Sequence, residues 1–266
     1  MKKKIIILAG GYSREREISI QTANAVFKQI RKEFNCKILD PKNNFIHQIR
    51  KFKPHVIFNA LHGRYGEDGY IQSILEIEKF KYTHSGVISS SLAMDKEISK
   101  RIYSKNKILT PKYIKYSFKK KLKKEIFFNY IMKKIGFPLV IKPINEGSSV
   151  NVFICSKKNI FKNLNKLKEY GEILIEKYIP GREIQVAVMG KKTLGTIELV
   201  PKRKFYDYKA KYSSKANTKH IMPASISKKK YQEVLKLAKR AHNLLGCRGV
   251  TRSDFRFFKN KFYLLE

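Results

Sequence analysis

The sequence predicts an α/β protein whose first domain is a doubly wound parallel sheet. Apolar strands alternate with amphipathic helices at the start of the chain, a pattern typical of parallel sheets covered by helices. Residues 4–9 and 56–61 read as buried strands, and each runs into a glycine-rich loop, at 10–11 and 62–69. Open parallel sheets bind ligands at the carboxyl ends of their strands. We therefore expect both loops to lie at a binding edge.

Two helices and a short strand complete this first domain, which we place at residues 1–92. Apolar side chains recur at helical spacing in residues 18–32 and again in residues 70–78. Each segment is therefore predicted to cover the sheet with one face. A short apolar run near Tyr82 reads as a further strand.

Helices and strands continue to the end of the chain. Residues 94–106 predict a helix, and the lysine-rich residues 115–135 predict a helix with a solvated face. Further strands are expected at 139–143, 150–155, 173–178, 184–189 and 192–200, and further helices at 159–170 and 228–245. The polar, tyrosine-rich residues 202–222 are expected to form a loop.

The charge of the chain is extreme, but its distribution disfavours a dedicated nucleic-acid surface. The chain has 58 Lys and Arg residues against 21 Asp and Glu, a net charge of +37. Such a charge attracts anionic partners. The lysines are nevertheless spread along the whole chain, and no zinc-ligand cluster or aromatic RNA-binding motif accompanies them. Nucleic-acid binding is the minor alternative, and it predicts steeply salt-dependent binding to unrelated duplexes.

The cysteines and the apolar runs predict a cytoplasmic protein. Cys36, Cys155 and Cys247 are odd in number and far apart, which favours a reducing cytosol over a disulfide framework. The first apolar run ends at Gly10, too early for the apolar region of about 7–15 residues in a signal peptide. No stretch approaches the roughly 20 apolar residues of a membrane span.

The end of the chain carries a candidate metal site. Two short apolar strands flank a turn around Asn260, and a three-residue turn would place Asp254 directly opposite Glu266. Like charges at such positions are destabilising, whereas a hard cation such as Mg²⁺ favours paired carboxylate oxygens. Two exposed acids at strand ends are the equal alternative. A two-residue turn would shift the register and weaken the geometry.

A second candidate site follows the predicted strand 139–143. The Gly-Ser-Ser sequence at 147–149 offers backbone N–H groups and hydroxyls that suit phosphate oxygens, and Lys142 precedes it with a point charge. Glu176 and Glu183 flank a Tyr-Ile-Pro-Gly segment whose exposed backbone suits an adenine edge, with a carboxylate for ribose hydroxyls. Read singly, these features are more often plain turns and surface acids.

Together, the motifs resemble the D-alanine–D-alanine ligase family of the ATP-grasp superfamily over essentially the whole chain. The matching runs lie at 10–19, 60–63, 66–69, 85–87, 94–96, 141–143, 146–149, 175–177, 205–212, 252–254 and 262–266. The resemblance implies a two-lobed ATP-grasp fold of α+β type after the parallel domain. Its central lobe is expected at 93–180 and its C-terminal lobe at 181–266.

The resemblance also implies an ATP-dependent joining of two D-alanines through an acyl phosphate, for peptidoglycan precursors. Glu15 is expected to engage the ammonium of the first D-alanine, in a hydrogen-bonded triad with Ser148 and Tyr212. His62 is expected near the carboxylate of that substrate, and Arg252 at the developing oxyanion. The alternative for Glu15 is an acid that caps a helix.

ATP and Mg²⁺ are the cofactors that the resemblance implies. The residues expected at ATP are Lys96, Lys142, Ser148, Ser149, Glu176, Lys177, Glu183 and Lys211. The lysines at 96, 142 and 211 would neutralise the phosphates. Asp254 and Glu266 would hold two Mg²⁺ ions, with Mn²⁺ as the alternative ion. The segment 202–222 fits a loop that closes over the acyl phosphate and excludes water.

The resemblance stops at Glu266, where the family continues into an Ala-Asn-Thr-x-Pro-Gly-Met segment with a further Mg²⁺ ligand. Two readings stay open. The chain is a ligase truncated at its C-terminus, or it is a catalytically impaired remnant that only binds nucleotide. The remnant predicts weak nucleotide binding and little dipeptide synthesis.

The expected partners are small molecules, ATP and D-alanine. D-lactate and D-serine are alternative acceptors, although the tyrosine-rich residues 205–212 resemble the members that use D-alanine. A homodimer is compatible with the resemblance, and neither a membrane nor a specific nucleic acid is expected.

Overall fold

The computed structural model describes residues 1–42, 44–119, 123–201 and 218–266. These residues divide into two compact units. The first unit is Met1–Met94 with Gly246–Thr251, and the second is Asp95–Leu245 with Arg252–Glu266. Among the helices in these ranges, none has the length and apolar character that a bilayer crossing requires.

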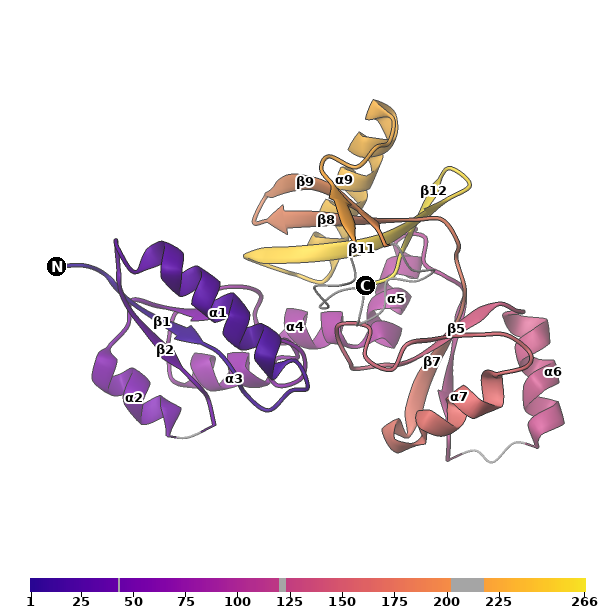
Figure 1. Ribbon diagram of the computed structural model, residues 1–266, viewed down its shortest axis with the longest axis horizontal. Coiled ribbons are helices and arrows are strands. Elements are labelled where there is room, and N and C mark those ends of the chain that lie inside the picture. Colours follow the sequence, from indigo (N-terminus) through magenta and orange to yellow (C-terminus); the bar gives the residue numbers. More distant parts are fainter. Residues whose placement is uncertain (43, 120–122, 202–217) are drawn as a thin grey trace. The chain divides into compact units, whose positions relative to one another are not determined.

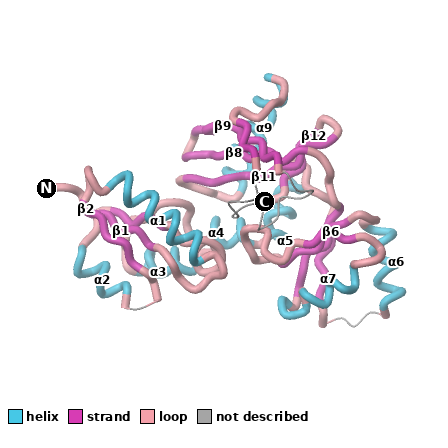
Figure 2. Tube along the Cα trace, in the orientation of Figure 1, coloured by secondary structure: helices cyan, strands magenta, loops and turns pink. Residues whose placement is uncertain are grey.

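The first unit is built on the parallel sheet that the sequence predicts. The order of its strands is β2-β1-β3, and both pairings are parallel. The strands are β1 (Lys4–Leu8), β2 (Asn35–Leu39) and β3 (Val56–Asn59). Ile57 forms a further parallel bridge with Tyr82, where a short strand is predicted. Figure 1 shows this sheet in the indigo, N-terminal part of the chain, and Figure 2 shows its strands in magenta.

Helices cover both faces of this sheet, so the doubly wound arrangement is confirmed. The helices of the unit are α1 (Arg16–Ile30), α2 (Phe45–Phe52), α3 (Tyr70–Ile77) and α4 (Val87–Met94). Ile6 packs in one cluster with Ile49 of α2 and Leu75 of α3, whereas Ile7 packs in another with Ala23 of α1. Successive side chains of β1 therefore enter opposite cores, which explains its continuous apolar run.

The second unit begins with α5 (Lys96–Lys105) and a four-stranded antiparallel sheet of order β4-β7-β5-β6. Its strands are β4 (Tyr113–Ser117), β5 (Leu139–Pro143), β6 (Phe153–Cys155) and β7 (Glu172–Lys177). α6 (Lys124–Lys134) and α7 (Ile160–Lys166) contribute Phe127 and Leu164 to the core of this sheet, and a short 3₁₀ helix (Lys168–Tyr170) follows α7.

A second antiparallel sheet completes the unit, with the order β10-β9-β8-β11-β12. Its strands are β8 (Arg182–Met189), β9 (Lys192–Val200), β10 (Lys219–Ile221), β11 (Val250–Phe258) and β12 (Lys261–Leu264). α9 (Lys228–Leu244) packs on β8 and β9. Figure 1 shows α9 beside these strands in the orange and yellow part of the chain.

Two predicted segments need correction. The expected helix 115–135 is wrong in its first part, because β4 ends at Ser117 and pairs with β7. Ile114 and Tyr116 alternate toward the sheet core, a period-two pattern that the surrounding lysines obscure. The expected loop 202–222 is wrong at its end, where β10 pairs with β9. Residues 202–217 lie outside the described residues.

The C-terminal hairpin has a two-residue turn, so the predicted three-residue turn is wrong. Phe258 pairs with Lys261, and the turn residues Lys259 and Asn260 have φ angles of 45° and 61°. Positive φ at both central residues is characteristic of type I′ turns, whose twist matches that of paired strands.

The shifted register does not separate the two acids at the end of the hairpin. The Asp254 N–H donates to the Glu266 carbonyl, and the Leu265 N–H donates to the Asp254 carbonyl, both at 2.8 Å. Leu265 and Glu266 therefore both lie opposite Asp254, as two residues lie opposite one in a β-bulge. Glu266 therefore returns to the side of Asp254 despite the shorter turn.

Candidate active site

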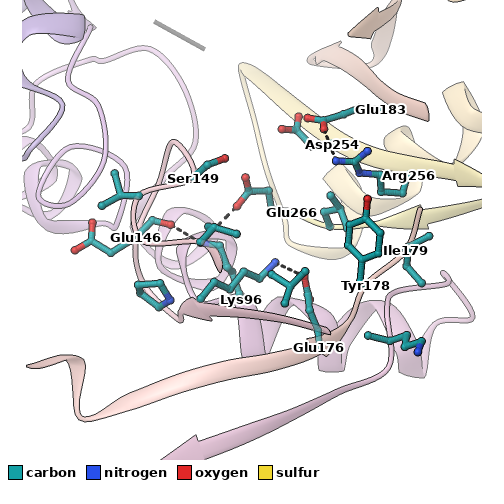
Figure 3. A pocket seen from close by; sticks show the side chains of 17 residues that line it. Lys96, Glu146, Ser149, Glu176, Tyr178, Ile179, Glu183, Asp254, Arg256 and Glu266 are labelled. Carbon is teal, nitrogen blue, oxygen red and sulfur yellow. Dashed lines mark hydrogen bonds and ion pairs between the residues drawn. The ribbon is translucent and has the colours of Figure 1, made fainter. Parts of the chain in front are cut away.

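A pocket in the second unit gathers most of the charged side chains that the sequence singles out. Its lining comes from α5, the β5–β6 loop, β7, β8 and the β11–β12 hairpin. In Figure 3, Lys96 and Glu176 lie on one side of the pocket, and Glu183, Asp254 and Arg256 lie on the opposite side. The predicted residues among its lining are Lys96, Lys142, Ser149, Glu176, Lys177, Glu183, Asp254 and Glu266.

The start of α5 places Lys96 at the pocket. The Asp95 carboxylate caps the helix by accepting from the N–H groups of Glu97 and Ile98, each at 2.9 Å. Lys96 Nζ donates to the backbone carbonyls of residues 144 and 146, and it lies 3.4 Å from Glu266 Oε2. Burial lowers the pKa of Lys96, and the Glu266 carboxylate offsets part of that effect.

Glu176 lies between two buried lysines. Its Oε1 is 2.7 Å from Lys142 Nζ, and its Oε2 is 3.0 Å from Lys100 Nζ. The second contact is an ion pair without hydrogen-bond alignment, since both atoms lack a hydrogen bond among the described residues. Burial acts to raise the pKa of Glu176, but the two lysine charges outweigh it and hold this pKa below its ordinary value.

The loop after β5 has an unusual backbone. Ser148, Ser149 and Asn151 have φ angles of 48°, 58° and 54°, in the left-handed region that L-residues seldom adopt. Successive residues of this kind point backbone N–H groups in new directions, and such concavities bind anions in many proteins. Ser149 lines the pocket, while Ser148 is not among the described lining.

Arginines hold two carboxylates on the other side of the pocket. Arg252 binds both oxygens of Asp254, at 2.7 and 3.0 Å, and Gln185 Nε2 donates to Asp254 Oδ2 at 3.2 Å. Arg256 Nη2 lies 3.0 Å from Glu183 Oε2. Figure 3 shows Glu183 and Arg256 pointing toward one another. Such bidentate and buried pairs fix the positions of both carboxylates.

Gly181 makes this arrangement possible at the start of β8. Its φ is 105°, and a Cβ there would meet the carbonyl oxygen of Phe257 at 2.4 Å. Glycine is therefore required where β8 begins beside β11, two residues before Glu183.

The carboxylates suit a hard cation in chemistry but do not form a complete ligand set. Asp254 and Glu266 are joined by the backbone hydrogen bond described above, and both line the pocket. Carboxylate oxygens are the ligands that Mg²⁺ prefers, and Mg²⁺ takes the rest of its coordination from water and phosphate. Within the described ranges, no group of three or more His, Cys, Asp or Glu side chains is arranged around a metal position.

The remaining predicted residues lie elsewhere in the chain. Glu15 and His62 belong to the first unit, where Glu15 is buried and its carboxylate packs against Gly63. His62 lines a pocket of that unit, and its Nε2 is 3.0 Å from Thr22 Oγ1. Lys211 and Tyr212 lie outside the described residues.

The structure disfavours the reading of Glu15 as a helix cap. Glu15 occupies the N-cap position of α1, but its side chain accepts no capping hydrogen bond from the N–H groups of the described first turn. Its carbonyl accepts from the Ser19 N–H at 3.0 Å, as any residue in this position does. Capping of α1 by a hydrogen bond therefore does not explain why the Glu15 side chain is buried.

Sequence reasoning missed Lys100 and Arg256. Lys100 stands four residues after Lys96, so both lie on one face of α5. Arg256 stands two residues after Asp254, so both project from the same face of β11. Spacing from the predicted site residues is the signal that could have identified them.

The comparisons with known proteins agree with this geometry. The family profile described as "D-ala D-ala ligase C-terminus" matches residues 102–266. A D-alanine–D-alanine ligase from Pelagibacter ubique is 60% identical to the chain, covering 100% of this chain and 87% of the relative. The chain belongs to the D-alanine–D-alanine ligase family. Membership confirms the resemblance drawn from the sequence and the prediction of an ATP-dependent ligase that forms carbon–nitrogen bonds.

Solved structures confirm the fold class. The D-alanine–D-alanine ligase of Bacillus anthracis superposes with a TM-score of 0.85 at 31% identity, covering 99% of this chain and 86% of that one. A structure of the B. anthracis ligase complexed with ATP gives a TM-score of 0.83 at 27% identity, covering 99% and 85% of the two chains. The α/β class with an ATP-grasp part is therefore confirmed.

Proposed function

We propose that this chain uses ATP to join two D-alanines into D-alanyl-D-alanine for peptidoglycan precursors, with the pocket of the second unit as its nucleotide site. One observation carries the proposal. In a member of this ligase family, Lys96, Lys142 and five carboxylates line one pocket beside a loop of left-handed backbone.

The charges of the pocket suit the chemistry. Phosphorylation of a carboxylate brings two anions together, and they repel unless cations neutralise them. Lys96 and Lys142 supply fixed positive charge, and Lys211 is the third lysine of the proposed set. The acyl phosphate formed in this way is attacked by the amine of the second D-alanine, and phosphate leaves.

The carboxylates supply the complementary part. Asp254 and Glu266 are the proposed ligands of Mg²⁺, two ions in the full site and replaceable by Mn²⁺, with phosphate oxygens and water completing each shell. When bound, the metal neutralises phosphate charge. The Arg252 guanidinium donates to both carboxylate oxygens of Asp254, at 2.7 and 3.0 Å. We propose that Arg252 also stabilises the oxyanion of the ligation step.

We assign the contacts with the adenosine of ATP to the connection between β7 and β8. Glu176, Lys177 and Glu183 lie at its two ends and line the pocket, and we assign Glu183 to the ribose hydroxyls. Ser148 and Ser149 offer hydroxyl and N–H groups to the phosphates.

The substrate residues of the first unit complete the proposal. Glu15 would bind the ammonium of the first D-alanine together with Ser148 and Tyr212, and His62 would lie near its carboxylate. Residues 1–92 would then act as the substrate domain, with ATP-grasp lobes at 93–180 and 181–266. We place the enzyme in the cytoplasm and expect no specific nucleic-acid partner and no membrane, and a homodimer is compatible with the family.

The test is dipeptide synthesis by the purified protein with ATP, Mg²⁺ and D-alanine. Stoichiometric D-alanyl-D-alanine, ADP and phosphate are expected, with no product from L-alanine. A matched control is Lys115→Met, which removes a lysine from an exposed pair with Glu172 and should leave the rate unchanged. ATP binding without dipeptide would instead support the nucleotide-binding remnant. Faster turnover with D-serine or D-lactate would overturn the assignment of the acceptor.

A further inference from the structure

Lys100 is a charged side chain of this site to which none of the roles above applies. Its side chain is completely buried, with 0% of its surface exposed, and it lies on α5 one turn beyond Lys96. Taking an ammonium group out of water is costly unless an opposite charge compensates it. A methionine would fill similar space without that cost, so the charge itself requires an explanation.

The contacts of Lys100 lead to Glu176. Among the described residues, Glu176 is the carboxylate paired with Lys100 Nζ, and the Tyr113 ring centroid lies 5.9 Å from the same atom. Lys142 takes the other oxygen of Glu176 at 2.7 Å. The carboxylate thus has one oxygen for each lysine.

The two lysines differ in their access to the pocket. Lys142 lines it, whereas Lys100 has no exposed surface from which to reach a ligand. A phosphate in the pocket would compete with Glu176 for Lys142 Nζ, because both anions attract the same ammonium group. Without a second cation, transfer of Lys142 Nζ to the phosphate would leave a buried carboxylate uncompensated, and nucleotide binding would carry the cost.

We infer that Lys100 is a positioning residue, which keeps Glu176 ionised and in place while Lys142 transfers from Glu176 to the phosphates of the nucleotide. The inference rests on the proposed function, because it takes the anion to be ATP. Burial lowers the pKa of Lys100 to about 8, so the ammonium form still predominates near neutral pH.

A double-mutant cycle on ATP binding tests the inference. Lys100→Met should weaken binding of ATP to the full chain about tenfold, measured by calorimetry with Mg²⁺ present. In the Glu176→Gln background there is no carboxylate charge left to compensate, so adding Lys100→Met should change the affinity less than about twofold. In steady state, the KM for ATP should rise while the KM for D-alanine stays constant.

The control and the contrary outcomes separate this role from a structural one. Lys115→Met is the matched control. Lys115 pairs with Glu172, which lies on β7 as Glu176 does, but this pair is exposed at the surface. The substitution should leave ATP affinity unchanged. A folded Lys100→Met protein with a lower melting temperature and unchanged ATP affinity would overturn the inference. If Lys100→Met does not fold, the double variant decides, because a large loss of affinity relative to Glu176→Gln contradicts compensation.

Failure of the inference is distinguishable from failure of the proposed function. Wild-type protein that binds no ATP would contradict the function. Wild-type binding that Lys100→Met leaves unchanged would contradict only the role of Lys100.

Discussion

The two sides of the pocket in the second unit differ in the sign and in the partners of their charges. On the lysine side, formed by α5, β5 and β7, the ammonium groups of Lys100 and Lys142 pair with one carboxylate, Glu176, and the buried Lys96 is the third cation. On the acid side, formed by β8 and the C-terminal hairpin, the carboxylates outnumber the arginines. The acid side comprises Glu183, Asp254 and Glu266 with Arg252 and Arg256.

The difference supports the proposal that one pocket accepts both parts of a metal–nucleotide. Excess positive charge on the lysine side suits phosphates, and excess negative charge on the acid side suits a divalent cation. Lys96 joins the two sides through its pair with Glu266 at 3.4 Å. The lysine side is also the more deeply buried, so its charges cost more to hold without a ligand.

The pH dependence of stability gives the largest expected effect on the lysine side. Burial lowers the pKa of Lys100 from 10.5 to about 8 in the folded chain, where Glu176, Lys142, Glu266 and Tyr113 act on its ammonium group. Between these values the unfolded chain binds more protons, so the free energy of unfolding rises with pH. Relative to Lys100→Met, wild type should gain about 3 kcal/mol between about pH 7 and pH 11, measured by denaturant unfolding.

Lys115→Met provides the contrast for this experiment. The hydrogen bond to Glu172 raises the pKa of Lys115, so its pair weakens only at higher pH and the wild-type advantage should fall there. A constant difference in stability between wild type and Lys100→Met across the range would contradict the account of the lysine side.

Removal of Lys142 should give the next largest effect. Lys142→Met deletes a charge that we propose contacts phosphate, but it leaves Glu176 paired with Lys100, so the fold should persist. ATP affinity should fall about 30-fold, or about 2 kcal/mol, as measured by calorimetry. An affinity within about twofold of wild type would remove the lysine side from nucleotide binding.

The acid side should respond to metal instead. Asp254→Asn should raise the Mg²⁺ concentration for half-maximal activity about tenfold at saturating ATP, because one charged ligand is lost. Glu198→Gln is the matched control, since Glu198 is also a buried carboxylate held by an arginine in the same sheet but does not line the pocket. Equal Mg²⁺ dependence in wild type and Asp254→Asn would show that the acids are not metal ligands.

The sequence predicted the strands and helices that carry the site residues better than it predicted which side chains pair with one another in the fold. Strand β5 has the predicted bounds, and its position explains why Lys142 and the following loop belong to one pocket. Period-two and helical patterns report which face of an element is apolar. They do not report which strand will lie against a given helix, so the pairing of Lys100 with Glu176 was beyond them.

The hairpin illustrates the same limit at its turn. Two-residue and three-residue turns at Lys259–Asn260 place different residues opposite each other, and both are compatible with the apolar pattern of the strands. The proximity of Asp254 and Glu266 depends on the two backbone hydrogen bonds after β12. A local irregularity of this kind has no sequence signal of its own.

Isotope transfer tests the central claim most directly. D-alanine labelled with ¹⁸O in its carboxylate is incubated with the protein, ATP and Mg²⁺, and the released phosphate is examined by mass spectrometry. The account predicts one labelled oxygen in each phosphate formed with dipeptide, because the carboxylate oxygen bridges to phosphorus in the acyl phosphate. Dipeptide released with unlabelled phosphate would contradict it.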